Sequence, residues 1–322
     1  MVRYTVKRVL MMIPIILIVT LILFILLYSL TGSSIRLMPA YGGGDALDSM
    51  FDFFGAGDNL FTKYIRYCYN VFFHLDLGKS GNGRLDVASE LGYRVNNTLL
   101  LLASGVGVTL AAGIPIGVYC SMHKDSKGDR IINVVSLFFS SIPNYAVAMS
   151  LALIFSVYLR IIPVLSDYTT PTAFILPTLT ITLGGVASVS RMTRASMLEV
   201  LEQPYITALR SKGLKEAEVV YSHALKNALI PVISILGGLI SQLLFGTIVV
   251  EYFFNTPALG TYMLRAVSGR DHFAILGCTV VLAVILTVLN IVVDLLYAIA
   301  SPQIRLRYSG KSGAGMRRGI VK

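Results

Sequence analysis

The stretch RASMLEVLEQPYITALRSKGLKEAEVVYSHALKNALIPV, residues 194–232, carries many charged residues although it lies between long apolar segments. Its first part has apolar residues spaced as on one face of a helix, until Pro204 interrupts the pattern. A short piece over residues 205–212 then ends at Gly213, a residue suited to the left-handed turn that closes a helix. A further helix is expected to run from Lys215 into the next apolar segment. The sequence thus predicts a short helix between two longer ones, too polar for burial in lipid and suited to docking a soluble partner.

The composition around this stretch is that of an integral membrane protein. Of the 322 residues, 55% are hydrophobic and 14% are charged, and the mean hydropathy is +0.73. A soluble globular chain has roughly 25% charged residues. Because a bilayer core about 30 Å thick needs roughly 20 apolar residues in a helix, we predict an all-α polytopic fold. Six segments fit, at approximately 9–30, 99–121, 131–158, 171–190, 229–250 and 273–300.

The distribution of Lys and Arg predicts the orientation of these segments, because cytoplasmic loops carry an excess of both. When both termini are placed in the cytoplasm, most of the 27 basic residues fall on the cytoplasmic side. This topology divides the chain into an N-terminal tail with the first span (1–30), an extracytoplasmic loop or cap (31–94), a transmembrane core (95–302) that includes the cytoplasmic loop 191–228, and a basic cytoplasmic tail (303–322).

Several classes of function are disfavoured by the residue content. The net charge of +10 does not indicate a nucleic-acid partner, because the chain has no Trp and its basic residues lie beside apolar spans. The three cysteines, Cys68, Cys120 and Cys278, lack the spacing of a metal site or a disulfide framework. The histidines lie in loops or at span ends and no catalytic set can be assembled, so we predict no catalytic site, no metal and no cofactor. The sequence also lacks a G-x-x-x-x-G-K-[ST] phosphate-binding loop, so we expect the chain itself not to bind nucleotide.

Residues 194–232 resemble the cytoplasmic signature loop of binding-protein-dependent ABC importer permeases, in the branch for dipeptides, oligopeptides and nickel. Further matches follow in order along the chain: RYTVKRVLMMIPIILIVTLILFIL at 3–26, HLDLGKS at 74–80, SLFFSSIPNY at 136–145, VVEYFFNTPALGTYMLRAVSGRDH at 249–272 and LNIVVDLLYAIASPQIR at 289–305. In the wider superfamily the loop has the form E-A-A, three residues, then Gly. Here Thr207, Ala208 and Leu209 stand before Gly213, so the first Glu is absent.

This resemblance implies a multi-pass permease subunit in the lipid of a bacterial cytoplasmic membrane. Such a permease pairs with a second homologous permease as a heterodimer. It works with two ATP-binding subunits and an extracytoplasmic binding protein. The resemblance places the ATPase contact at Tyr205, Ile206, Leu209, Arg210 and Gly213. It implies a peptide substrate, with nickel or a nickel chelate as the alternative. An ion-driven secondary transporter, and a short helix that only covers its own spans, are the competing interpretations.

Four residues in the third apolar segment, Ser140, Ser141, Pro143 and Asn144, interrupt it with small polar groups and a proline. In a permease they could line the passage. A kink at the proline, with serine hydroxyls bonding the freed carbonyls, explains the same pattern. Both interpretations stay open at this point.

Tyr252, Phe253 and Phe254 lie beside charged residues on the predicted outer side, and we expect them to contact the binding protein. The alternative is an aromatic belt at the membrane interface. Gly113 and Gly117 form a G-x-x-x-G pair, which we interpret as helix packing inside this subunit rather than a dimer seam.

Asp294 lies well inside an apolar run, and an intramembrane carboxylate is a candidate for function. Arg305 and Arg307 follow at the inner end of the same segment. We therefore predict a structural ion pair for Asp294.

Overall fold

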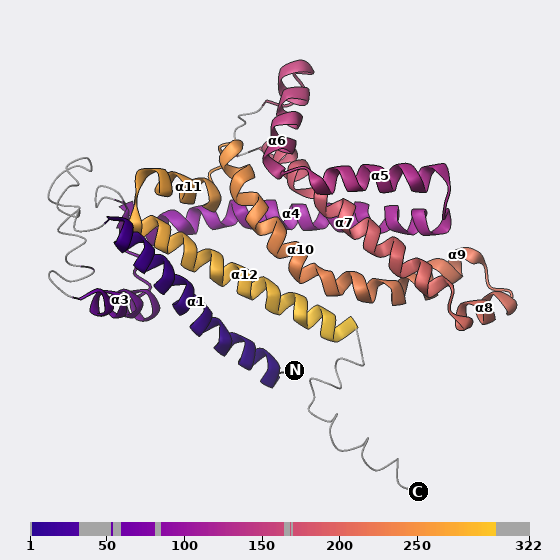
Figure 1. Ribbon diagram of the computed structural model, residues 1–322, viewed down its shortest axis with the longest axis horizontal. Coiled ribbons are helices and arrows are strands. Elements are labelled where there is room, and N and C mark those ends of the chain that lie inside the picture. The colour runs from indigo at the N-terminus through magenta and orange to yellow at the C-terminus, as the bar shows by residue number, and fades with distance from the viewer. Residues whose placement is uncertain are drawn as a thin grey trace, which may run out of the picture. The chain divides into compact units, whose positions relative to one another are not determined.

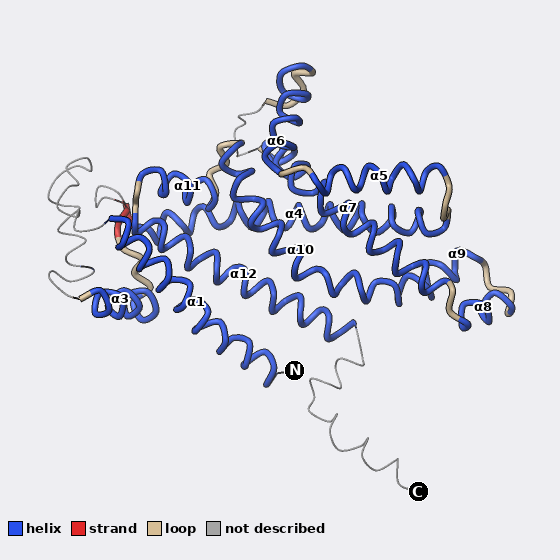
Figure 2. Tube along the Cα trace, in the orientation of Figure 1, coloured by secondary structure: helices blue, strands red, loops and turns tan. Residues whose placement is uncertain are grey.

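Helices make up nearly all of the described chain, as Figure 2 shows. The computed structural model describes residues 2–31, 53, 59–80, 85–163, 168 and 170–300. The α-helices are α1 (Val2–Thr31), α3 (Leu60–Tyr69), α4 (Val87–Met122), α5 (Lys127–Ser141), α6 (Asn144–Ala152), α7 (Ile175–Leu201), α8 (Pro204–Ser211), α9 (Glu216–Glu218), α10 (Leu225–Phe253), α11 (Leu259–Gly269) and α12 (His272–Ala300). Shorter helical turns are η2 (Asn70–His74), η3 (Leu153–Tyr158), η4 (Pro171–Phe174) and η5 (Val219–Ala224), and the strands β1 (Lys79–Ser80) and β2 (Leu85–Asp86) pair antiparallel.

Five helical segments are long and apolar enough to cross a membrane, at Leu10–Leu27, Val87–Met122, Pro171–Leu201, Glu216–Phe253 and His272–Tyr297. They overlap five of the six predicted spans, so the all-α polytopic fold class is confirmed. The third predicted span is not one straight helix. It consists of Lys127–Ser141 and Asn144–Tyr158, which are bent by 106° relative to each other. Pro143 lies in the break, and because proline lacks an N–H the helix cannot continue regularly across it.

The chain divides into two compact units, and the first of them includes Leu100–Phe254. The helix α7 lies at the centre of this unit, with α5, α6 and α10 packed against it (Figure 1). Thirteen of the 27 residues of α7 are buried, including Leu176, Ile181 and Val189. A helix that is covered on several sides in this way holds its neighbours in place, so α7 is the element that organises the unit.

Two glycines let α4 approach α7 closely. A Cβ atom on Gly117 would lie 2.6 Å from the carbonyl oxygen of Ser190 and 2.5 Å from Cβ of Thr193. A Cβ atom on Gly113 would lie 2.8 Å from Cβ of Val189. Carbon atoms in contact prefer separations of about 3.5–4.0 Å, so only glycine fits at this distance. The interpretation of the G-x-x-x-G pair as packing inside the subunit is confirmed.

The second unit includes Thr5–Leu99 and Asn255–Val288. Within it, α3 is tied to α1 through the hydroxyl group of Tyr64, which donates to the carbonyl oxygen of Leu17 at 2.6 Å. The same hydroxyl lies 3.1 Å from Oγ1 of Thr20. Part of the segment predicted as an outer cap is thus helical and packed on the first span.

The start of α11 is held by side chains from α4, in the same unit. The Asn97 amide donates to the carbonyl oxygen of Pro257 at 2.9 Å, and the Thr98 hydroxyl accepts from the N–H of Leu259 at 3.0 Å. The residue before α11 is Ala258, which has no side-chain oxygen to cap the helix. Thr98 therefore supplies the cap from a distant part of the sequence.

Candidate functional site

The short helix predicted between two longer ones is present as α8, and Figure 1 shows it beyond the ends of α7 and α10. Gln203 precedes it in an extended conformation, and Pro204 stands in its first turn. Proline is well tolerated there because the first N–H groups of a helix have no partner within the helix. After α8, the short elements α9 and η5 lead directly into α10. We call residues 202–224 the α8 hairpin.

Gly213 closes α8 in a left-handed turn with φ of 80°, as the sequence predicts. Its N–H donates to the carbonyl oxygen of Arg210 at 2.9 Å, and the N–H of Leu214 donates to that of Leu209 at 3.5 Å. The side chains of Leu209 and Leu214 also pack on the same apolar cluster. This combination is a Schellman motif. A Cβ atom on Gly213 would meet nothing within 4 Å, so the backbone conformation, and not lack of space, selects glycine here.

One side of α8 is anchored in the first unit by Ile206 and Leu209. Ile206 is 0% exposed and belongs to an apolar cluster with Met197, Val219 and Val220, against which Leu209 packs. A side chain buried in its own subunit cannot be offered to another protein. The predicted place of Ile206 in the ATPase contact is therefore corrected: Ile206 positions α8 from inside.

The opposite side of α8 is open. Tyr205 is 40% exposed, and the exposed residues around it are Pro204, Thr207, Ala208, Arg210 and Ser211. Of the five residues predicted for the contact, Tyr205, Arg210 and Gly213 are exposed. Leu209 is half-buried against the apolar cluster.

Two side-chain contacts brace the α8 hairpin. Arg210 donates to both carboxylate oxygens of Glu216, at 3.1 and 2.7 Å, across the turn at Gly213. Hydrogen bonding to Glu216 raises the pKa of Arg210, so its guanidinium stays charged. The Asn227 amide donates to the hydroxyl oxygen of Tyr205 at 2.8 Å. This second bond joins α8 to the first turn of α10.

A buried ion pair joins the start of α5 to the last part of α7, the helix that leads into α8. Asp129, which is 2% exposed, accepts from Nε and Nη2 of Arg194 at 2.7 and 2.6 Å. The N–H of Asp125 and the amide of Asn133 donate to the same carboxylate. Our sequence predictions did not include this pair. The spacing of Ser126 and Asp129 is the pattern that marks the start of a helix, and it was the available signal in the sequence. In the structure Ser126 does cap α5, since its hydroxyl oxygen accepts from the N–H of Asp129 at 3.2 Å.

Residues 113–306 match the family described as "Binding-protein-dependent transport system inner membrane component". The match covers more than half of the chain and includes α7, the α8 hairpin and α10. The chain belongs to this family.

The permease is similar over nearly its whole length to named transport proteins. It is 32% identical over 314 residues to the dipeptide transport system permease protein DppB of Bacillus subtilis, covering 96% of this chain and 100% of that protein. It is 34% identical over 316 residues to the oligopeptide transport system permease protein AppB of the same organism (94% and 99% covered). It is 32% identical over 308 residues to the glutathione transport system permease protein GsiC of Escherichia coli O6:H1 (95% and 100% covered). With its membrane-length helices, the permease is a multi-pass protein of the bacterial inner membrane.

The permease breaks its third span where small polar residues were predicted to line the passage. The hydroxyl of Ser140 donates to the carbonyl oxygen of Ser136 at 2.7 Å, and that of Ser141 donates to Leu137 at 2.9 Å. Both carbonyls lie within α5 and are not the ones freed by the break at Pro143, so these bonds do not decide between the two interpretations. A role along the passage stays a prediction.

The same break contacts the neighbouring helices of the first unit. Arg191 of α7 donates to Oγ of Ser140 at 2.8 Å. The amide of Asn144 lies against α10, where it would be 2.5 Å from a Cβ atom placed on Gly246. The bent pair α5 and α6 is therefore tied to both α7 and α10.

The three aromatic residues predicted to meet a binding protein are not equivalent. Tyr252 is 49% exposed and Phe253 is half-buried, but Phe254 is 1% exposed. The hydroxyl of Tyr168 donates to the carbonyl oxygen of Phe254 at 2.6 Å. Phe254 therefore packs inside the first unit, and its predicted role as a surface anchor is corrected.

Asp294 of α12 is half-buried. The two arginines predicted to pair with it, Arg305 and Arg307, lie outside the described residues. Its ion pair stays a prediction.

Proposed function

We propose that this permease is a transmembrane subunit of an ATP-driven importer of short peptides, and that α8 is its contact with a separate ATPase subunit. The observation that carries the proposal is the construction of α8. Its apolar side is fixed in the subunit by Ile206, while Tyr205 and Arg210 remain exposed. An exposed short helix with so rigid an attachment suits a mechanical contact with a soluble protein. ATP is hydrolysed by the partner, and the permease has no catalytic role.

Movement of α8 passes into the spans because α8 is attached to several of them. Ile206 shares an apolar cluster with Met197 of α7, and Tyr205 is bonded to Asn227 of α10. The pair of Asp129 and Arg194 then links α7 to α5. When the ATPase subunits close, α5, α7 and α10 move with α8. Rigid-body rocking of this kind opens a passage alternately to the two sides of a membrane.

The proposed assembly contains two homologous permeases, two ATP-binding subunits and an extracytoplasmic binding protein. Both termini of this chain lie in the cytoplasm, on the side of α8. The passage runs by Ser140, Ser141, Pro143 and Asn144 at the break between α5 and α6. Irregular backbone at membrane depth is tolerated where it lines a water-filled cavity or is buried in protein, which supports this placement.

Peptide is the proposed cargo because the similar proteins are named as dipeptide, oligopeptide and glutathione permeases. Nickel or a nickel chelate is the alternative. The cargo and the energy source can be tested together in liposomes that contain the complete transporter.

With the binding protein and a radiolabelled dipeptide outside and ATP at the ATPase side, we expect uptake that requires ATP and persists with a protonophore. Uptake that needs no ATP and stops with the protonophore would identify a secondary transporter. Uptake of radioactive nickel without any uptake of peptide would favour the nickel alternative.

Replacing Arg210 by Ala is expected to leave uptake and ATP hydrolysis close to the wild-type rates. The ion pair with Glu216 is exposed, because 43% of the Arg210 side chain and 48% of the Glu216 side chain are open to solvent. Exposed ion pairs contribute roughly 0–1 kcal/mol to stability. Rates should be measured in membranes with matched subunit levels. A severe loss of coupling would mean that Arg210 is enclosed in the ATPase contact and is not at its rim.

A cysteine at Tyr252 is expected to cross-link to the binding protein in the complete transporter, because this aromatic side chain is exposed near the predicted outer end of α10. The background variant should lack the native cysteines. Val249, one turn earlier and 43% exposed, is the matched control position and should not cross-link. If a cysteine at Tyr252 reacts only with a lipid-phase reagent, the residue belongs to an interfacial aromatic belt.

A further inference from the structure

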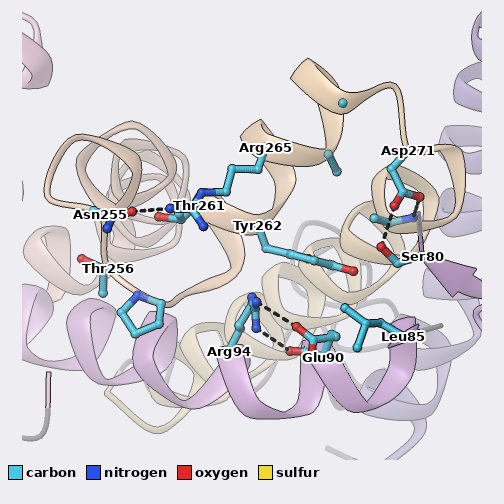
Figure 3. Close-up of a pocket in the computed structure, with 14 residues that line it drawn as sticks. Ser80, Leu85, Glu90, Arg94, Asn255, Thr256, Thr261, Tyr262, Arg265 and Asp271 are labelled. Atoms are coloured by element: carbon cyan, nitrogen blue, oxygen red, sulfur yellow. Dashed lines mark hydrogen bonds and ion pairs between the residues drawn. The ribbon is translucent and has the colours of Figure 1, made fainter. Parts of the chain in front are cut away.

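A cavity of about 410 Å³ lies within the second unit, between the start of α4, α11 and the start of α12 (Figure 3). This volume falls in the range of about 300–1,000 Å³ that small-molecule sites occupy. Its wall carries two arginines, Arg94 and Arg265, and two carboxylates, Glu90 and Asp271. The formal charges of the wall therefore cancel. Such a cavity favours a ligand that carries both charges over a simple anion or cation.

The carboxylates of the wall already have partners. Asp271 accepts from Oγ of Ser80 at 2.6 Å and from the N–H of Ala274 at 3.0 Å. Glu90 lies 2.8 Å from Nη2 of Arg94, one helical turn away on α4. The acidic groups thus help to hold the wall of the cavity together.

Unused hydrogen-bond donors lie along the wall. Arg265 donates to the side-chain oxygen of Asn255, and it forms no ion pair with the residues that the structure describes. Thr261 also borders the cavity, but its hydroxyl oxygen is enclosed in the wall and is not open to the cavity. The guanidinium of Arg94 stands 4.6 Å from the ring centroid of Tyr262, which orients it (Figure 3). Since a guanidinium has five N–H donors, both arginines can bind a further acceptor.

We propose that this cavity binds a short peptide by its carboxylate end, with Arg265 and Arg94 as the binding residues. A carboxylate accepts two parallel bonds from a guanidinium, which gives such a contact both strength and direction. The ammonium end of the same peptide would lie toward Glu90 and Asp271, so both charges of the ligand meet the opposite charge.

The size of the cavity favours a free peptide over a single acidic side chain from a docked protein, because one carboxylate group would leave most of the space and the acidic part of the wall unused. The inference rests on the proposed function, since peptide is the proposed cargo. It adds a binding site on the permease itself, independent of the binding protein.

Photo-labelling of the purified transporter, complete except for the binding protein, tests this site. The probe is alanyl-photoleucine, a dipeptide whose diazirine links to nearby residues on illumination. We expect it to label residues 255–271 and to be displaced by unlabelled dialanine. The C-terminal amide of the probe lacks the carboxylate charge and should label about tenfold less or worse, since hydrogen bonds to charged groups are the strong ones.

Arg265→Gln is expected to lower labelling about tenfold, for the same reason. Arg265→Lys keeps the charge but not the paired donors, so it should retain part of the labelling. Arg270→Gln is the matched control, because it removes the same charge just beyond α11 but outside the wall of the cavity. It should label like the wild type. Abundance in the membrane and thermal stability of each variant show whether it is folded.

Equal labelling by the acid and the amide, or full labelling of folded Arg265→Gln, would overturn the proposal. If Arg265→Gln is labelled normally but needs more binding protein to reach the same rate of uptake, the cavity is a docking surface for the binding protein. That outcome also overturns the proposal. Carboxylate-dependent labelling in a transporter that takes up no peptide would support the site while refuting the proposed function.

Discussion

Gly213→Val is expected to uncouple transport: uptake and substrate-stimulated ATP hydrolysis should fall together, by about tenfold, with little change in the amount of subunit in the membrane. Gly213 has a φ of 80° and closes the Schellman motif of α8. An L-residue in this region costs roughly 1–2 kcal/mol, and a β-branched residue is strongly disfavoured. The turn would relax, and α8 would present a misaligned surface to the ATPase. The spans insert independently of this turn.

Gly213→Asn is the matched control, because asparagine adopts the left-handed conformation readily and a Cβ atom at this position meets no neighbour within 4 Å. It should couple nearly normally. Both variants should be compared in liposomes with equal amounts of every subunit. Normal coupling in Gly213→Val would mean that α8 is only a connector. An equal loss in both variants would show that any side chain at Gly213 obstructs the contact and that φ is not the cause.

Arg194→Ala is expected to destabilise the permease by about 3 kcal/mol and to lower its thermal unfolding temperature by several degrees. The substitution leaves the carboxylate of Asp129, 2% exposed, without its arginine, although the N–H of Asp125, the amide of Asn133 and the thiol of Cys120 remain as donors. We expect the lower end of the usual range because the Arg194 side chain is 24% exposed. Coupling should weaken as well, since α5 is no longer tied to α7. Unfolding should be followed in the same detergent or nanodisc for every variant.

The double variant Asp129→Leu with Arg194→Met separates the ion pair from its packing. Removing both charges leaves no buried carboxylate without a counterion, so this variant should lose less stability than Arg194→Ala alone. Arg210→Ala, which breaks an exposed pair, should not change the unfolding temperature measurably. Equal stability of Arg194→Ala and the wild type would mean that the pair contributes nothing to holding α5 against α7.

The break in the third span shows what sequence could and could not anticipate. Ser140, Ser141 and Pro143 indicate an interruption by local chemistry, and the structure has one there. The angle of 106° and the contact of Arg191 with Ser140 depend on where α7 and α10 run. Local residues can stop a helix, but they do not decide what the freed groups meet.

The burial of individual side chains was the property that the sequence predicted least well in this chain. In a soluble protein an apolar residue tends to be inside, but here apolar side chains face lipid as readily as they face other helices. Ile206 and Phe254 were expected at contacts with partners, and both are buried in their own subunit. Tyr205 and Tyr252, which were expected at the same two contacts, are exposed.

The membrane class, the all-α fold, five of the six predicted spans and the turn at Gly213 could be predicted from the chain alone, because each depends on local hydropathy or on one residue's backbone freedom. The pairing of Asp129 with Arg194, 65 residues away, and the common cavity of Arg94 and Arg265 became visible in the folded protein. Charges so far apart in the chain meet only when particular helices pack together. Which helices pack is set by the fit of many side chains at once, and no local pattern records that fit.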